Sequence, residues 1–148
     1  MHVLLLNGPN LNLLGQREPH IYGHQTLEDL LTQLQQDFPD HAFDHFQSNH
    51  EGALIDRLQR LLDHPRDGLI INAGALTHYS YALHDALKAL ALPKVEVHLS
   101  HIFAREPFRH TSVISPACDG MISGLGLDGY RLAMQWLLWR QPPATRLA

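Results

Sequence analysis

Short apolar runs alternate with segments of helical periodicity over the first 140 residues of the chain. The runs that include Val3, Ile70 and Val95 are apolar almost throughout, which is typical of strands buried on both faces. Between the runs, apolar residues recur at every third or fourth position, which predicts amphipathic helices. We predict strands at residues 3–6, 42–47, 68–72, 95–100 and 120–123, and helices at about 27–38, 54–62, 78–90 and 130–140.

Polar residues mark where the predicted helices begin. Thr26 and Asp29 have the spacing of a capping box, with Asp in place of the more usual Glu. Thr77 is the predicted N-cap of the third helix, which would carry His78 at its start and Asp85 seven residues on along the same face. Asp128 is a candidate N-cap for the last helix.

The order of the predicted elements determines the fold class. Strands and helices alternate, and this order predicts parallel strands joined by right-handed crossovers. The second strand has the mixed pattern of a sheet edge, whereas its neighbours are apolar. We therefore expect an α/β fold, a flavodoxin-like three-layer sandwich around a five-stranded parallel sheet of order 2-1-3-4-5. Residues 1–140 are expected to form one catalytic domain, with 141–148 as a flexible tail.

Composition narrows the class of protein further. A formal net charge of −4 argues against nucleic acid or an anionic membrane surface as the main partner. Cys118 is the only cysteine, which excludes an internal disulfide and fits a reducing compartment. The sequence shows no leader of the signal-peptide type and no apolar run of the roughly 18 residues that a membrane span needs. These features predict a soluble cytoplasmic protein.

The segment 7–23, directly after the first predicted strand, is rich in groups that do chemistry. Asn10 offers an amide, Arg17 a permanent cation and Tyr22 a phenol. Ligands of open α/β sheets bind beyond the carboxyl ends of the strands, where this segment would lie. A surface loop explains each residue better when it is taken singly, but the set predicts a ligand site covered by a mobile lid.

A second group of candidates follows the later strands. Glu96, His98 and Ser100 alternate along one predicted strand, so their side chains would share a face, and a carboxylate beside an imidazole makes it a better proton donor. Asn72 ends another strand at the same edge of the sheet. Arg105 and Arg109 flank Glu106-Pro107, where proline suits the first position of a helix, and paired guanidiniums favour a carboxylate ligand.

Two further patterns resemble a nucleotide-binding motif and a metal site, but both are incomplete. Residues 124–129 read GLGLDG, which matches the glycine pattern of dinucleotide sites, but no later strand supplies the acid that binds ribose. The chain has 12 histidines, yet His98 and His101 would face opposite ways on a strand, and no cysteine pair or HExxH motif accompanies them. We expect neither a nucleotide cofactor nor a metal site.

The candidate functional groups that remain are a phenol beside an arginine, an imidazole beside a carboxylate, amides and a carboxylate-binding arginine. Proton abstraction beside a carbonyl with departure of a hydroxyl would use these parts. Four long segments then carry a resemblance over residues 1–140, in the expected order. They are NGPNLNLLGQREPHIYG, INAGALTHYSYALHDAL, VEVHLSHIFAREPFRHTSVIS and SGLGLDGY. The chain resembles the type II 3-dehydroquinate dehydratases.

The resemblance implies a reaction and an assembly. The family has a flavodoxin-like fold, assembles as a dodecamer built of trimers, and uses no metal or organic cofactor. It removes water from 3-dehydroquinate to give 3-dehydroshikimate by anti elimination through an enolate, in the shikimate pathway to aromatic amino acids or in quinate breakdown. Its substrate is a small molecule, so neither nucleic acid nor membrane is an expected partner.

Motif positions also imply roles for single residues. Tyr22 would be the base that removes the C2 proton, with Arg17 as the cation beside it. His98 would protonate the departing hydroxyl, with Glu96 orienting it, and Asn10 would help to hold the enolate oxygen. The residues implied to bind substrate hydroxyls and carboxylate are Asn72, His78, Leu99, Ser100 and Arg109.

The two remaining assignments concern the surroundings of the site. Asp85 would reach the site of a neighbouring subunit, and Arg105 would support the acidic cluster. The departures from the family pattern are His101, Tyr79 and Thr111, which flank the site. A flavin- or nucleotide-binding module is the alternative function, but the loop after the first strand has one glycine and a proline where a phosphate cradle is needed. A receiver-like regulatory domain would need an acid where Asn72 stands.

Overall fold

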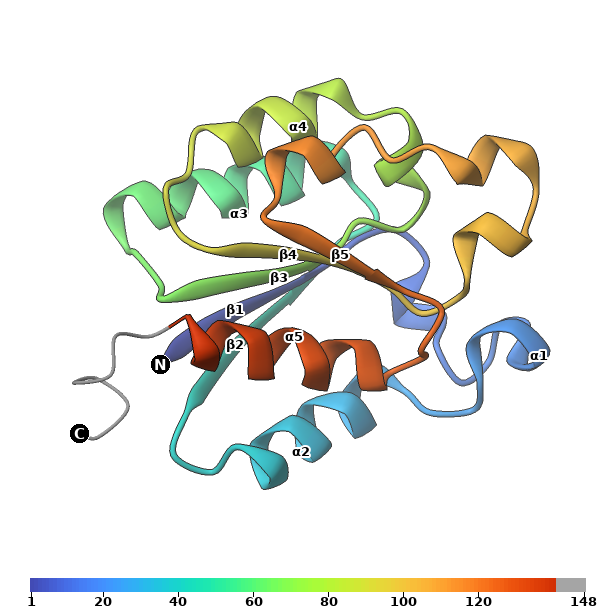
Figure 1. The fold of residues 1–148 in the computed structure, drawn as a ribbon, viewed down its shortest axis with the longest axis horizontal. Helices are drawn as coiled ribbons and strands as arrows, with labels where there is room; N and C mark the ends of the chain where they lie inside the picture. Colours follow the sequence, from blue (N-terminus) through green and yellow to red (C-terminus); the bar gives the residue numbers. More distant parts are fainter. Residues whose placement is uncertain (141–148) are drawn as a thin grey trace.

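The structure is a computed structural model, and it describes residues 1–140 of the chain. Within these residues, five strands form one parallel sheet with the order β2-β1-β3-β4-β5, as predicted (Figure 1). The strands are β1 His2–Asn7, β2 Ala42–Gln47, β3 Gly68–Asn72, β4 Lys94–His98 and β5 Gly120–Ser123. The predicted tail, 141–148, lies outside the described residues.

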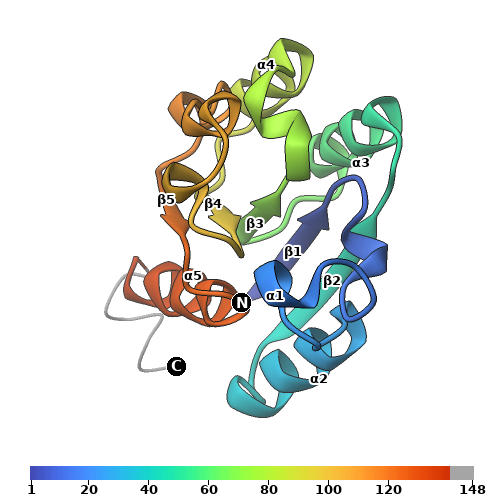
Figure 2. The same ribbon diagram turned by 90° about the vertical axis from the view of Figure 1, so that its right-hand side faces the viewer.

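Helices cover both faces of the sheet. Helices α3, Glu51–Asp63, and α4, Tyr81–Lys88, lie on one face, and α2, Leu27–Asp37, and α5, Asp128–Trp139, lie on the other (Figures 1 and 2). Side chains of successive strand residues point to opposite faces, so Leu4 packs toward α3 and Leu5 toward α5. No helix within residues 1–140 has the length and apolar character needed to cross a membrane.

The start of α2 confirms its predicted cap. The Thr26 side chain accepts a hydrogen bond from the Asp29 N–H, and the Asp29 carboxylate accepts one from the Thr26 N–H. These reciprocal bonds satisfy two backbone donors that a helix end otherwise leaves unpaired. A short helix, α1, Pro19–Tyr22, precedes this cap and belongs to the loop after β1.

The other two predicted caps are wrong. Residues 74–78 form a separate 3₁₀ helix, η2, and α4 starts after it with Ser80 as its N-cap. Thr77 is buried inside η2 instead, so His78 and Asp85 lie on different elements and share no helix face. Ser80 fills the cap position because its hydroxyl accepts a hydrogen bond from the Leu83 N–H. Asp128 is the first residue of α5 and caps nothing; its carboxylate accepts a bond from Arg131.

The fourth strand ends earlier than predicted. β4 stops at His98, and Leu99 and Ser100 form a bend before the 3₁₀ helix η3, Ile102–Ala104. Ser100 therefore does not continue the face that Glu96 and His98 share. The bend is held by the glycine-rich segment, because the N–H groups of Gly124 and Gly126 donate to the carbonyls of His98 and Leu99.

Polar amides line the carboxyl edge of the sheet. In the strand register, Asn7 pairs with Gln47 on one side and with Asn72 on the other. The loops that leave β1 and β3 cross here in close contact: a Cβ on Gly8 would lie 2.4 Å from the carbonyl oxygen of Ala73. Only glycine permits that approach. The crossing brings the two loops that carry candidate site residues into contact.

Candidate active site

A cavity opens at this carboxyl edge, where Figure 2 shows the loops after the strands in front of the sheet. It encloses about 550 Å³ of empty space with its open mouth included. Ten predicted site residues line it: Asn10, Arg17, Tyr22, Asn72, His78, His98, Leu99, Ser100, Arg105 and Arg109.

Two predicted residues lie outside the wall of the cavity. Glu96 is fully buried behind His98 on β4. Asp85 is exposed on α4 and does not line the cavity of its own chain. The structure therefore brings eleven of the twelve predicted residues together, counting Glu96 through its contact with His98.

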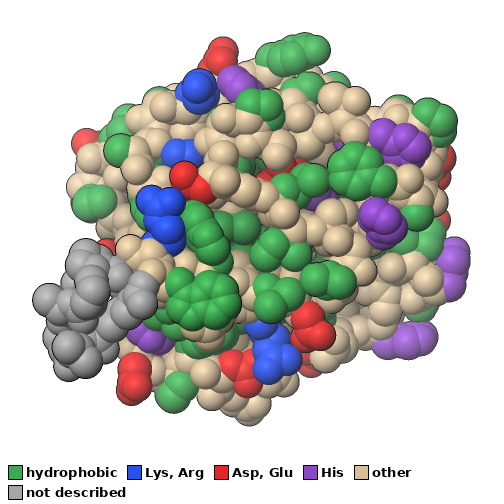
Figure 3. Space-filling model, viewed as in Figure 1, with side chains coloured by type: hydrophobic (Ala, Val, Ile, Leu, Met, Phe, Trp, Pro, Cys, Tyr) green, Lys and Arg blue, Asp and Glu red, His purple; other side chains and the backbone are tan. Residues whose placement is uncertain are grey.

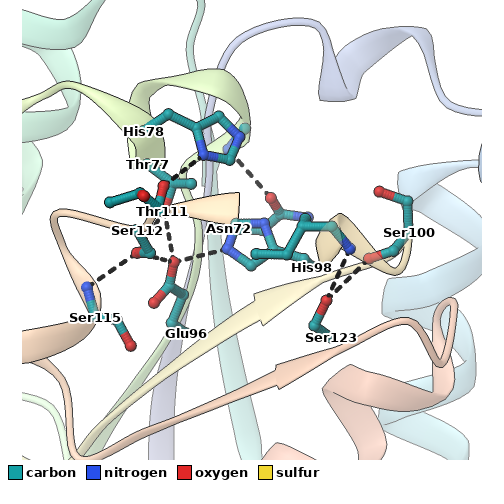
Figure 4. Close-up of polar contacts among 12 residues, drawn as sticks. Asn72, Thr77, His78, Glu96, His98, Ser100, Thr111, Ser112, Ser115 and Ser123 are labelled. Atoms are coloured by element: carbon teal, nitrogen blue, oxygen red, sulfur yellow. Dashed lines mark hydrogen bonds and ion pairs between the residues drawn. The ribbon is translucent and has the colours of Figure 1, made fainter. Parts of the chain in front are cut away.

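The His98 imidazole and the Glu96 carboxylate form a buried hydrogen-bonded pair. The Nε2–H of His98 donates to Oε1 of Glu96 over 2.6 Å, as the period-2 spacing predicted (Figure 4). Strand alternation explains the placement: Val95 and Val97 face the α5 side, which sends Glu96 and His98 to the opposite face. The bond engages one ring nitrogen and leaves Nδ1 for other contacts.

Two hydroxyl groups also hold the Glu96 carboxylate. Thr77 donates to Oε1 over 2.5 Å and Ser112 donates to the same atom over 2.6 Å. Burying an ionised carboxylate costs several kcal/mol, and three bonds to a charged acceptor, at about 1.5–3 kcal/mol each, are of the size needed to offset it. Burial alone would raise the pKa of Glu96, but these bonds and the nearby His98 charge hold that pKa below its ordinary value.

Sequence reasoning missed both hydroxyl contacts. Thr77 was interpreted as a helix cap, and its position between a strand and a helix carried no sign that it faces β4. Ser112 lies in an irregular loop 16 residues from Glu96. No periodicity links such positions, and only the fold brings them together.

His78 stands beside His98 with its ring nearly parallel, at 6.5 Å between ring centres and 17° between planes. Its Nδ1–H donates to the carbonyl of Thr111 over 2.8 Å. Burial, followed by the charges of His98 and Arg109, lowers the pKa of His78 below its ordinary value despite that bond. The ring is therefore neutral near pH 7, and Nε2 keeps a lone pair that can accept a hydrogen bond.

Tyr22 is held by two arginines rather than one. Nη1 of Arg105 donates to the Tyr22 hydroxyl over 2.9 Å and to Oγ of Ser100 over 3.0 Å. The guanidinium carbons of Arg17 and Arg105 each lie 5.3 Å from the centre of the Tyr22 ring. Arg17 was predicted as the neighbouring cation; it lies beside the ring and pairs with Glu18, while Arg105 makes the contact to the hydroxyl.

The other arginine of the cavity, Arg109, pairs with Glu106 one turn away. This contact follows from the 3₁₀ helix η4, Pro107–His110, in which residues three apart face each other and which begins with the predicted proline. Nε faces Glu106, so the remaining guanidinium donors are available to a carboxylate in the cavity. The bond from Arg109 lowers the pKa of the exposed Glu106.

The histidines do not form a metal cluster in the described part of the chain. Figure 3 shows several of them spread over the end of the molecule that carries the loops after the strands. Among residues 1–140, no group of three or more His, Cys, Asp or Glu side chains is placed to hold a metal ion. The loop after β1 likewise offers no phosphate cradle, because the Gly8 N–H donates to the Asn72 carbonyl.

Comparison with known proteins identifies the family. The family model described as "Dehydroquinase class II" matches residues 1–138. The chain belongs to the class II dehydroquinase family. It is 57% identical over 137 residues to the 3-dehydroquinate dehydratase of Anoxybacillus flavithermus, an alignment that covers 91% of this chain and 92% of that protein. The corresponding protein of Bacillus subtilis (strain 168) is 51% identical over 148 residues, covering 98% and 99%.

Solved class II dehydroquinase structures agree with the fold. The crystal structure of the type II dehydroquinase from Butyrivibrio crossotus superposes with a TM-score of 0.90 at 46% identity, covering 93% of this chain and 97% of that one. The enzyme from Propionibacterium acnes gives 0.87 at 43% identity, covering 92% and 94%. Fold class, family and reaction were thus all predicted correctly, and the flavin-binding alternative gains no support.

Proposed function

We propose that the chain dehydrates 3-dehydroquinate to 3-dehydroshikimate in the shikimate pathway, with Tyr22 as base and His98 as acid. Family membership and the names of its relatives support the reaction. The observation that supports the roles is the cavity itself, which combines a phenol held by arginines with an imidazole backed by a buried carboxylate. Elimination through an enolate needs such a base and such an acid.

The base removes the proton at C2, next to the ketone. Neutral phenol is a weak base at neutral pH, so the reaction needs the phenolate. Guanidinium charges stabilise phenolate, and Arg105 and Arg17 lie against the hydroxyl and the ring of Tyr22. The electrons of the broken C–H bond move into the ketone and form an enolate, whose oxygen would bond to Asn10, directly or through water.

The acid completes the elimination. Nε2–H of His98 is committed to Glu96, so only the imidazolium carries a second proton, on Nδ1, to give away. The C1–O bond then breaks as the enolate collapses, its electron pair goes to the hydroxyl oxygen, and the proton from Nδ1 turns that oxygen into water. Glu96 stabilises the imidazolium that must form before each turnover.

The remaining cavity residues would hold the substrate. Arg109 would bind the substrate carboxylate through its free guanidinium donors. The neutral His78 would accept a bond from a substrate hydroxyl, and Asn72 would bind another, since its side chain is fixed by the Gly74 N–H. The groups of Leu99 and Ser100 that face the cavity would complete these contacts.

Three further properties belong to this proposal. Residues 1–140 form a single catalytic domain that works in the cytoplasm and needs no metal or organic cofactor, because side chains supply acid, base and anion stabilisation. The chain assembles as a dodecamer, a tetramer of trimers. Asp85 reaches the site of a neighbouring subunit, since its exposed place on α4 is away from the cavity of its own chain.

Adding 3-dehydroquinate to the purified protein tests the function directly. We expect the absorbance of a conjugated enone to grow at the same rate with and without a chelator. Glu96→Gln is the matched control: it keeps the shape of the buried side chain, removes the charge, and should lose most of the rate. Lack of enone formation by the folded chain would contradict the activity, and a chelator effect reversed by one specific ion would contradict metal independence.

A further inference from the structure

All the polar contacts of the Glu96 carboxylate converge on one oxygen atom. Oε1 accepts from Nε2 of His98 and from the hydroxyls of Thr77 and Ser112, at 2.5–2.6 Å (Figure 4). Oε2 is buried as well, yet no group among residues 1–140 donates to it. A donor lost from Oε1 therefore has no substitute on the other oxygen.

Neighbouring contacts turn the Ser112 hydroxyl toward Glu96. The N–H of Ser115 donates to Oγ of Ser112 over 3.0 Å, which uses a lone pair and leaves the hydroxyl proton free to donate. Oγ of Thr77 and Oγ of Ser112 are 3.3 Å apart, and both reach Oε1 more closely than they reach each other. A carboxylate that accepts two hydroxyl donors and an imidazole N–H is stabilised in its charged form.

The segments that carry the two hydroxyls are joined by backbone hydrogen bonding. The N–H of Val113 donates to the carbonyl of Thr77 over 2.8 Å, and the imidazole of His78 donates to the carbonyl of Thr111. Thr77 is fully buried and Ser112 is partly buried. These bonds between the two segments hold both hydroxyls beside Glu96.

We propose that Thr77 and Ser112 are positioning residues that keep Glu96 ionised and aimed at Nε2 of His98, so that His98 holds the proton it gives to the leaving hydroxyl. This inference rests on the proposed function. Neither residue lines the cavity, so neither is expected to touch the substrate. They act through Glu96: each donor removed raises the proton affinity of the carboxylate, so that the proton of the Glu96–His98 pair shifts from His98 toward Glu96.

Other charged and titratable groups surround the Glu96–His98 pair, and the variants that test the proposal must leave these groups unchanged. The cavity wall contributes the cations Arg17, Arg105 and Arg109 and the phenol Tyr22. From η2, the His78 ring lies beside His98. Cys118 is a further neighbour. Burial raises the pKa of its thiol to about 12, so the thiol is neutral at the pH of the assay. The substitutions below leave all of them unchanged.

Thr77→Val and Ser112→Ala each remove one hydroxyl with little change of shape. We expect each to lower kcat at pH 7 about tenfold, the size of one charged hydrogen bond partly transmitted to His98. KM should change less than about twofold, because neither hydroxyl is expected to touch substrate. Above all, the alkaline limb of kcat against pH should move to higher pH, because a carboxylate with fewer donors is a less stable anion and the Glu96–His98 pair then keeps its proton to higher pH. Thr77→Ser, which restores the donor, should restore the limb.

Ser80→Ala is the matched control. Ser80 is a buried hydroxyl three residues from Thr77 that caps α4 and makes no contact with Glu96. We expect it to lower thermal stability while leaving the pH profile unchanged. If the wild type is active and the alkaline limb stays at the wild-type pH in both Thr77→Val and Ser112→Ala, the positioning role is wrong. A wild type without dehydratase activity would overturn the proposed function instead. Thr77 and Ser112 are tested independently, so if one variant fails to fold, the result from the other still decides the question.

Discussion

His98 and Tyr22 line the same cavity, but the chain supports them by different means. His98 ends the interior strand β4, is 5% exposed, and bonds to a carboxylate that two hydroxyls also hold. Tyr22 ends the four-residue helix α1 in the loop after β1. Its hydroxyl bonds to Arg105, two guanidiniums lie beside its ring, and the ring packs against the edge of the hydrophobic core. A regular strand therefore positions His98, the proposed acid, whereas the position of Tyr22, the proposed base, depends on the conformation of a loop.

Backbone geometry reinforces this contrast. The loop after β1 contains two non-glycine residues with positive φ, Asn10 at 69° and Glu18 at 40°. Asparagine tolerates this region, but for Glu18 it is strained by about 1–3 kcal/mol. Such strain persists only where surrounding contacts hold it, and few groups bury this segment. We infer that ligand contacts in the cavity contribute to holding Tyr22 in its working position.

The largest expected effect comes from removing Tyr22, the proposed base. Tyr22→Phe should lower kcat by about a thousandfold or more, because general base catalysis is worth about 10²–10⁴, while substrate affinity changes little. Turnover and equilibrium binding of 3-dehydroquinate measure the two effects separately. Tyr81→Phe, which removes a phenol from the surface of α4, is the control and should behave as wild type. Near-normal turnover of Tyr22→Phe would show that another residue is the base.

Smaller losses should follow from changing the cations beside the base. Arg105→Lys and Arg17→Lys should each lower kcat by about 10–100-fold, because an ammonium cannot reproduce the flat fork of donors. Without the guanidinium the phenolate that the reaction needs is harder to form, so the residual rate should rise as pH increases. The pH dependence of kcat tests the sign, and a residual rate that falls with pH would contradict a phenolate base.

The surroundings of His98 and of Tyr22 also differ in how far the sequence predicts them. Apolar runs placed the strands, and the period-2 spacing of Glu96 and His98 predicted their contact because a strand fixes side-chain direction. The contact between Arg105 and Tyr22 spans 83 residues and joins two irregular loops, so no local pattern encodes it. The same is true of Thr77 and Ser112. Repeating elements are readable from sequence, and contacts between loops become visible only in the folded chain.

The smallest expected effect concerns Asp85 and tests whether the active site includes a residue from a second copy of the chain. Asp85 is exposed on α4, which packs on the face of the sheet that carries Glu96, yet it does not line its own cavity. If it serves a neighbouring subunit, Asp85→Ala should lower activity severalfold or weaken trimer assembly. Activity and size, by light scattering, distinguish these two results.

Mixing variants separates a shared site from a complete one. In an equal mixture of Asp85→Ala and Tyr22→Phe chains, exchanged at random, about a quarter of the sites would combine an intact Tyr22 with an intact Asp85 from the adjacent copy, since each site draws the two residues independently. Activity should therefore rise above the average of the separate variants after subunit exchange. If each chain completed its own site, every site would carry one defect and exchange would restore nothing. Exchange itself is followed by mass spectrometry of isotope-labelled chains, so an unchanged activity in fully exchanged oligomers would rule out the contribution of Asp85 across subunits.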